Sequence, residues 1–144
     1  MAEITEAAMR GELDFKESFR RRMMLLKGMD ESVLKGIADN LPVTEGAPRL
    51  IATLKRMGYK IGILSGGFTY FAQRLQKAFG IDYVFANELE FIDGKLSGEV
   101  KGEIVDGQRK ADLLVQLAAK EGMSPDQVSW TRHICNHNRF AVRR

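Results

Sequence analysis

Short apolar stretches alternate with helical patterns along the middle of this chain, and this alternation limits the folds that it can adopt. We predict helices over residues 48–57, 69–79 and 108–121, where apolar residues recur at helical spacing. Between the helices lie residues 59–65 (YKIGILS) and 82–87 (DYVFAN), which have too few polar residues for a strand with one wet face. The alternation predicts an α/β layer with a parallel sheet.

The pattern differs before and after this middle part, so we divide the chain into three. Residues 1–42 carry helical patterns and form a helical unit, whereas residues 43–128 form the α/β part. Asp93 and Gly94 lie between two extended runs, which predicts a hairpin. Residues 129–144 differ from the rest in composition and form a basic tail.

The tail contains four arginines and no acidic residue, together with the single Trp, the single Cys and both His of the chain. We predict that it is disordered and that the chain has no nucleic-acid partner. Two alternatives stay open. His133, Cys135 and His137 alternate as metal ligands would on one face of a strand. The arginines offer charge for binding nucleic acid.

The rest of the composition bears on location. A single cysteine excludes an internal disulfide framework and is typical of a reducing compartment. No apolar stretch approaches the roughly 18 residues that a membrane span needs. We therefore expect a cytoplasmic protein without a membrane partner.

Ser65, Gly66 and Gly67 stand where a predicted strand ends and a predicted helix begins. In open parallel sheets, ligands bind beyond the carboxyl ends of the strands. A hydroxyl, bare backbone N–H groups and a helix N-terminus together suit phosphate. Lys110, near the start of the helix over residues 108–121, is a candidate cation for it. A plain tight turn and a solvated lysine are the alternatives.

Four stretches of the chain resemble the phosphoserine phosphatases of the haloacid dehalogenase superfamily. They are EAAMRGELDFKESFRRRMMLLKG, GYKIGILSGGF, IDYVFANELEFIDGKLSGEV and GEIVDGQRK. Their order and spacing agree with the family from residue 1 to Val128, which is nearly nine-tenths of the chain. The resemblance implies an α/β fold, a fragment of a haloacid dehalogenase-type Rossmann-like core with part of a helical cap.

The resemblance also implies roles for single residues. Ser65 holds the transferring phosphoryl group beside the Gly66 N–H, and Lys110 neutralises the phosphate and the aspartyl-phosphate intermediate. Arg22 pairs with the substrate carboxylate, a task suited to a bidentate guanidinium. Two apolar residues, Phe15 and Met9, shield the substrate from water. The alternatives are ordinary core positions for Phe15 and Met9, and a surface charge for Arg22.

The family reaction is the Mg²⁺-dependent hydrolysis of O-phospho-L-serine in serine biosynthesis, with the nucleophile and general acid in an Asp-x-Asp motif. This sequence contains no Asp-x-Asp, and SWTRHICNHN follows Val128 where the family has Gly-Asp-Gly-x-Asn-Asp. We therefore predict no nucleophile, general acid or metal ligand in this chain, and little or no turnover by the chain alone. The alternative is a non-catalytic fragment that binds phosphate or phosphoserine.

The resemblance has a structural consequence too. In the family fold the strand that carries Asp-x-Asp lies beside the strand predicted over residues 59–65. Without it we expect a bare edge on that apolar strand. We therefore predict a marginally stable chain that self-associates through an exposed sheet edge.

Overall fold

The computed structural model of the chain describes residues 3, 4, 6, 10, 14–132 and 139–143, and for residues 130–132 and 139–143 only the backbone. Its strands form one five-stranded sheet in the order β3-β2-β1-β5-β4. The strands are β1 (Ile61–Phe68), β2 (Tyr83–Ile92), β3 (Lys95–Lys101), β4 (Val128–Arg132) and β5 (Arg139–Arg143).

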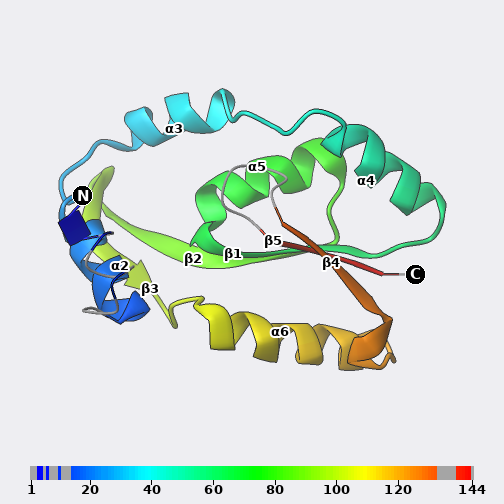
Figure 1. The fold of residues 1–144 in the computed structure, drawn as a ribbon. Helices are drawn as coiled ribbons and strands as arrows, with labels where there is room; N and C mark the ends of the chain where they lie inside the picture. Colours follow the sequence, from blue (N-terminus) through cyan, green and yellow to red (C-terminus); the bar gives the residue numbers. More distant parts are fainter. Residues whose placement is uncertain (1–2, 5, 7–9, 11–13, 133–138, 144) are drawn as a thin grey trace.

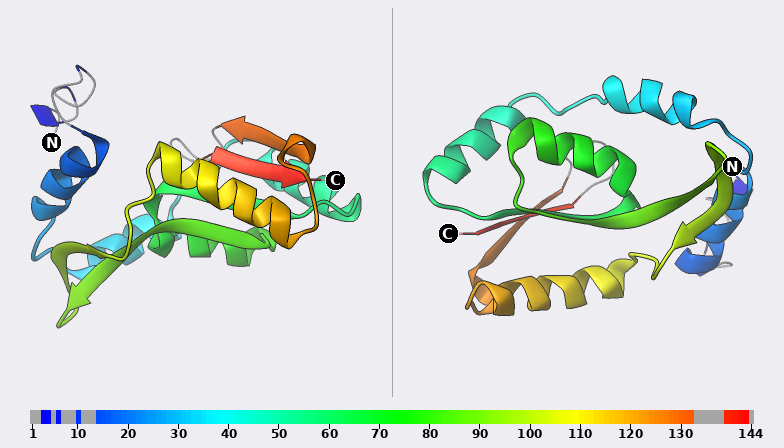
Figure 2. Two further views of the ribbon diagram at one scale, coloured as in Figure 1. Left: turned by 90° about the horizontal axis from the view of Figure 1, so that it is seen from below. Right: turned by 180° about the vertical axis from the view of Figure 1, so that it is seen from behind.

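Helices cover both faces of this sheet (Figure 1). On one face lie α3 (Glu31–Asp39), α4 (Ala47–Arg56) and α5 (Thr69–Phe79), and on the other lies α6 (Gly107–Lys120), which a short 3₁₀ turn, η1 (Pro125–Gln127), connects to β4. Helix α2 (Phe15–Met24) stands apart at one end, against β3 (Figure 2). The fold is therefore the α/β class that the sequence predicts. No helix in the described part of the chain is long and apolar enough to cross a membrane.

Strand β1 lies at the centre of the core, because its side chains are buried on both faces. Ile61 and Ile63 pack with α4 and α5, in a cluster completed by Ala47, Ile51, Ala72, Leu75 and Ile81. Leu64 points to the opposite face and packs under α6 with Val105, Leu113 and Leu114. This confirms the prediction that the run over residues 59–65 is a strand without a wet face.

A third cluster attaches the helical unit to the rest of the fold. Phe19 and Met23 of α2 pack with Leu34 of α3 and with the hairpin residues Leu89 and Leu96, and Ile104 completes the cluster. The hairpin turns at Asp93 and Gly94, which both have positive φ, 50° and 74°. Positive φ at both central residues is what a two-residue hairpin turn requires, so this prediction is confirmed.

The sheet differs from the prediction in two ways. Only the β1–β2 pair is parallel among the described pairs, whereas β1–β5, β2–β3 and β4–β5 are antiparallel. In addition, we expected disorder over residues 129–144, but this stretch contains β5 and all of β4 except its first residue, Val128.

The second difference changes the expected edge. β5 pairs with β1 from Ile61 to Leu64, so β1 has a neighbour on each side and the bare edge that we expected there is absent. Self-association through that edge consequently loses its basis. The backbone N–H and C=O groups at a free strand edge need partners, and another strand that can reach the edge supplies them.

Candidate functional site

The Ser-Gly-Gly stretch is a bulge in β1 rather than a turn after it. Leu64 pairs with Phe85 and Phe68 pairs with Asn87, so β1 takes four steps while β2 takes two. Three residues of β1, Ser65, Gly66 and Gly67, thus lie opposite one residue of β2, Ala86, and this stretch leaves the regular ladder. Bulges of this kind are common beside active sites, because they redirect backbone groups and side chains.

The bulge leads directly into a helix start. Ser65 is buried, and its hydroxyl oxygen accepts a hydrogen bond from the Gly67 N–H at 2.9 Å. Helix α5 begins at Thr69, and its N-cap residue, Phe68, makes no side-chain hydrogen bond to the first turn. A hydroxyl and the N–H groups of a helix start thus lie within a few residues of each other, which is the combination that suits an anion.

Lys110 reaches this bulge from another part of the chain. It lies in the first turn of α6, whose N-cap is Asp106. A Cβ atom added to Gly66 would stand 3.7 Å from the Lys110 ammonium nitrogen and 3.4 Å from the Val105 carbonyl oxygen. The glycine at position 66 therefore leaves open the space beside the Lys110 ammonium, and any side chain there would occupy it.

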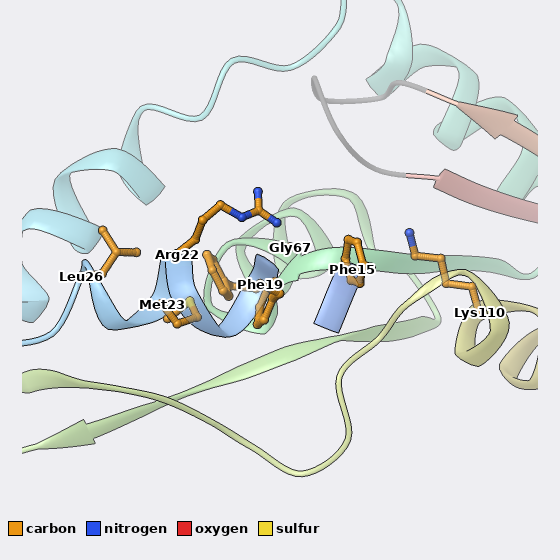
Figure 3. A pocket seen from close by; sticks show the side chains of 9 residues that line it. Phe15, Phe19, Arg22, Met23, Leu26, Gly67 and Lys110 are labelled. Atoms are coloured by element: carbon orange, nitrogen blue, oxygen red, sulfur yellow. The ribbon is translucent and has the colours of Figure 1, made fainter. Parts of the chain in front are cut away.

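Helix α2 closes the site from the side of the helical unit. Arg22, which is half-buried, lines the same pocket as Phe15, Gly66 and Lys110, and the volume of this pocket is about 360 Å³. The charged ends of Arg22 and Lys110 lie on either side of the Phe15 ring in Figure 3. The pocket thus has one cation from the helical unit and one from the α/β part.

The wall between these cations is apolar. The Phe19 ring lies 6.1 Å from the Phe15 ring and 5.9 Å from the Phe68 ring, centroid to centroid. Met23 and Leu26 continue the wall (Figure 3). Such a surface keeps water from the polar groups beside it, and this strengthens electrostatic interactions in the pocket.

The structure therefore brings together most of the residues that the resemblance singled out. One pocket is lined by Phe15, Arg22, Gly66 and Lys110. Ser65 precedes Gly66 in the chain, and its hydroxyl oxygen accepts a bond from the lining residue Gly67. Met9 lies outside the described residues, as do the tail residues His133, Cys135 and His137. The roles of all these residues stay predictions.

Sequence reasoning missed one residue that touches several parts of the site. The Asn87 side chain, 1% exposed, bonds to the Ser-Gly-Gly bulge and to Val105. The signal was present: Asn87 is a single amide at the end of a run that is otherwise apolar after Asp82. A buried amide is costly unless its donors and acceptor are all used, so its position in such a run is informative.

A second unpredicted feature is an ion pair between the helical unit and α6. The Lys16 ammonium lies 3.3 Å from the Asp106 carboxylate, which also accepts a hydrogen bond from the Arg109 N–H at 2.8 Å. The Arg109 N–H holds the pKa of Asp106 below its usual value of 3.8, and Lys16 lowers it further. The carboxylate thus caps α6 and links it to α2.

The lowered pKa gives a prediction about acid stability. Because the folded-state pKa of Asp106 lies below 3.8, its stabilising contribution is complete above the unfolded value and is lost as pH falls through the folded value. Asp106→Asn keeps a good cap but removes the charge. We expect it to lower the free energy of unfolding by less than about 1 kcal/mol at neutral pH, since Lys16 is partly exposed. Denaturant unfolding of the unmodified chain and of Asp106→Asn is measured at a series of pH values. The difference in their free energies of unfolding should shrink below pH 3.8, and a difference that grows there would contradict the assignment.

The described residues do not make a magnesium site. Among them there is no group of three or more His, Cys, Asp or Glu that could hold a metal ion. The described residues that line the pocket include no carboxylate. Mg²⁺ is held mainly by carboxylate and water oxygens, so the described lining of this pocket does not fit that ion.

Comparison with known proteins shows the family of this chain. Residues 2–130 match the family model of the haloacid dehalogenase-like hydrolases. The chain belongs to this family. It is 47% identical over 128 residues to the phosphoserine phosphatase of Archaeoglobus fulgidus, a match that covers 89% of this chain and 37% of that protein. It is 49% identical over 124 residues to the phosphoserine phosphatase of Idiomarina loihiensis, covering 86% and 56%.

Solved structures of family members agree with the fold. The probable phosphoserine phosphatase of Vibrio cholerae matches with a TM-score of 0.78 and 46% identity, over 85% of this chain and 38% of that one. A substrate-bound phosphoserine phosphatase complex matches with a TM-score of 0.76 and 37% identity, over 85% and 59%. The chain thus spans between about a third and three-fifths of the length of these relatives.

Proposed function

We propose that this chain carries the phosphate-binding and carboxylate-binding half of a phosphoserine phosphatase site. The observation that carries the proposal is the convergence of Arg22, Gly66 and Lys110 on one pocket from two separate parts of the fold. The family and the names of the relatives support the same substrate. The ligand would be O-phospho-L-serine, a small molecule with a phosphate and a carboxylate.

The phosphate would lie between the bulge and α6. Phosphoryl-transfer sites work mainly by positioning the phosphate and neutralising its charge. Lys110 would supply the charge, and the Gly66 N–H and the N–H groups of the α5 start would supply directed donors, while the Gly67 N–H holds the Ser65 oxygen. The Ser65 hydroxyl would contact one phosphate oxygen, and the bond that its oxygen accepts from the Gly67 N–H holds it in place beside Gly66.

The carboxylate would meet Arg22. The Arg22 Nε lies 3.4 Å from the Ser18 carbonyl oxygen one turn earlier in α2, which holds the side chain along the helix. A guanidinium held in this way can still offer its terminal N–H groups to a carboxylate. Phe15, 41% exposed, would cover the ligand from the solvent side.

Catalysis needs more than these groups. The family mechanism uses the two aspartates of Asp-x-Asp, and this sequence has no such motif. We therefore propose that the chain alone binds the substrate but releases little or no phosphate. In the complete site, Mg²⁺ would draw charge from the phosphoryl oxygens. A role in serine biosynthesis and a cytoplasmic location belong to the same proposal.

The role of Arg22 gives a specific prediction. O-phosphoethanolamine has the phosphate and the amine of O-phosphoserine but lacks the carboxylate. We expect the chain to bind O-phosphoserine more tightly, and Arg22→Ala to lose about 10-fold in affinity for O-phosphoserine, because one charge-assisted contact is removed. Affinity for O-phosphoethanolamine should not change. Isothermal titration of both ligands measures this.

Arg21→Ala is the matched control. Arg21 lies next to Arg22 on α2, but it pairs with Glu17 at 2.8 Å and is 54% exposed. It should therefore leave both affinities unchanged. Equal losses for the two ligands in Arg22→Ala would count against a carboxylate contact and would point to a general effect on the pocket.

A further inference from the structure

We propose that Asn87 is a positioning residue that builds the phosphate-binding arrangement from two distant segments. Its side chain lies at the junction of the Ser65–Gly67 bulge and the segment that precedes α6. The inference rests on the proposed function, because it concerns the geometry of the same phosphate site.

The Asn87 side chain donates two hydrogen bonds to the bulge. Its Nδ2 donates to the Gly66 carbonyl oxygen at 3.0 Å and to the Gly67 carbonyl oxygen at 3.2 Å. The register shift of β1 takes these peptide groups out of the regular ladder. The side-chain amide therefore satisfies carbonyl groups that the neighbouring strand no longer pairs in the regular way.

These two bonds also orient the bulge. In a trans peptide the carbonyl of one residue and the N–H of the next point in opposite directions. Because the Gly66 carbonyl faces Asn87, the Gly67 N–H points away from Asn87, where it meets the Ser65 hydroxyl at 2.9 Å. The negative ends of two peptide dipoles are thus turned toward Asn87, so a bound anion is not repelled by them.

The acceptor of Asn87 connects this bulge to Lys110. Asn87 Oδ1 accepts a hydrogen bond from the Val105 N–H at 2.8 Å. Val105 directly precedes Asp106, the N-cap of the helix that carries Lys110. The same side chain therefore holds both the bulge, through the Gly66 and Gly67 carbonyl groups, and the start of the helix that carries the cation, and so it sets the distance between them.

No other residue type of this size offers the same set of bonds. Aspartate has nearly the same shape, but its carboxylate can only accept, so it would face the Gly66 and Gly67 carbonyl oxygens without a donor. Asn87→Asp should consequently rotate the Gly66 and Gly67 carbonyl groups away from position 87, while it keeps the acceptor for the Val105 N–H. Asn87→Ser keeps one short donor and adds no charge, so it should have a weaker effect.

The test is a titration of the full chain with inorganic phosphate. Binding is monitored through the amide resonances of Gly66 and Gly67 in ¹H–¹⁵N spectra. We expect Asn87→Asp to weaken phosphate binding by about 10- to 100-fold, the range that applies when a hydrogen-bonding partner of a metal-binding group is replaced. We expect Asn87→Ser to show an intermediate loss. Thermal unfolding of each variant is measured in parallel, and the titrations are made below the lowest unfolding temperature.

Two control variants separate positioning from stability. Asn40→Asp makes the same chemical change where the side chain donates to the Gly36 carbonyl oxygen at 2.9 Å, at the exposed end of α3. Ile51→Ala destabilises the cluster on the face of the sheet covered by α4 and α5. Both should keep the phosphate affinity of the unmodified chain.

The outcomes distinguish a failure of the proposed function from a failure of the positioning role of Asn87. If the unmodified chain does not bind phosphate, the proposed function fails and this inference fails with it. If the unmodified chain binds phosphate and the Asn87 variants bind it equally well, or lose no more affinity than Ile51→Ala, the inference alone is overturned. Loss of affinity in the Asn87 variants alone supports it.

Discussion

Replacing Lys110 by alanine should weaken binding of inorganic phosphate by about 10- to 100-fold, because a charge-assisted contact to a dianion is worth about 1.5–3 kcal/mol. The reason is geometric: Lys110 is the lysine that lines the pocket in the described part of the chain, and it faces the bulge across the open position at Gly66. Isothermal titration with phosphate measures the change.

Lys120→Ala is the control for this substitution. Lys120 belongs to the same helix, but it lies in the last turn, with its ammonium 5.0 Å from the centre of the Tyr83 ring. It removes the same charge from α6 at a distance from the pocket. Equal losses in both variants would mean that the net charge of the chain, rather than a contact at Lys110, governs phosphate binding.

Replacing Phe19 by alanine should have the largest effect on stability, a loss of about 3–5 kcal/mol in the free energy of unfolding. Phe19 is 4% exposed and joins α2 to the hairpin, with its ring between those of Phe15 and Phe68. A loss of this size is a large share of the roughly 5–15 kcal/mol that stabilises an ordinary domain. Urea unfolding followed by circular dichroism measures it.

Leu25→Ala tests whether this loss is specific to the buried contact. Leu25 follows α2 directly and is 57% exposed, so its truncation should change the free energy of unfolding by no more than about 0.5 kcal/mol. A Phe19→Ala loss as small as that of Leu25→Ala would mean that α2 is not held by the cluster around Phe19.

The middle of the fold could be predicted because its signals are local. The apolar run over residues 59–65, the helix over residues 69–79 and the Asp93–Gly94 turn each follow from a short stretch of sequence. β1, α5 and the β2–β3 hairpin agree with them. Periodicity and turn chemistry are sufficient where neighbouring residues decide the structure.

The tail could not be predicted in this way because its pairing is not local. Residues 139–143 have no clear strand period, yet they pair antiparallel to β1. The identity of that partner depends on which strand leaves an edge open, and this is a property of the whole sheet. Strand formation depends on its context more strongly than helix formation does.

The site was predicted in part, and for a different reason. Arg22 and Lys110 were selected through resemblance to a family, since their separate positions in the sequence give no sign that they share a pocket. Asn87 and the Lys16–Asp106 ion pair escaped notice because each connects segments that only the fold brings together. A buried amide in an apolar strand needs several hydrogen-bond partners, so this signal could have pointed to Asn87. It could not have pointed to the Lys16–Asp106 ion pair.

The central claim is that this chain binds O-phosphoserine without hydrolysing it, and one measurement tests both halves. The ³¹P resonance of O-phosphoserine is followed over time with the unmodified chain and Mg²⁺, with Lys110→Ala as the control. We predict that the unmodified chain shifts or broadens the resonance, that Lys110→Ala does so far less, and that no inorganic phosphate accumulates above the control. An unperturbed resonance would contradict the binding half. Release of inorganic phosphate that depends on Lys110 would contradict the other, and would mean that another carboxylate of this chain acts as the nucleophile.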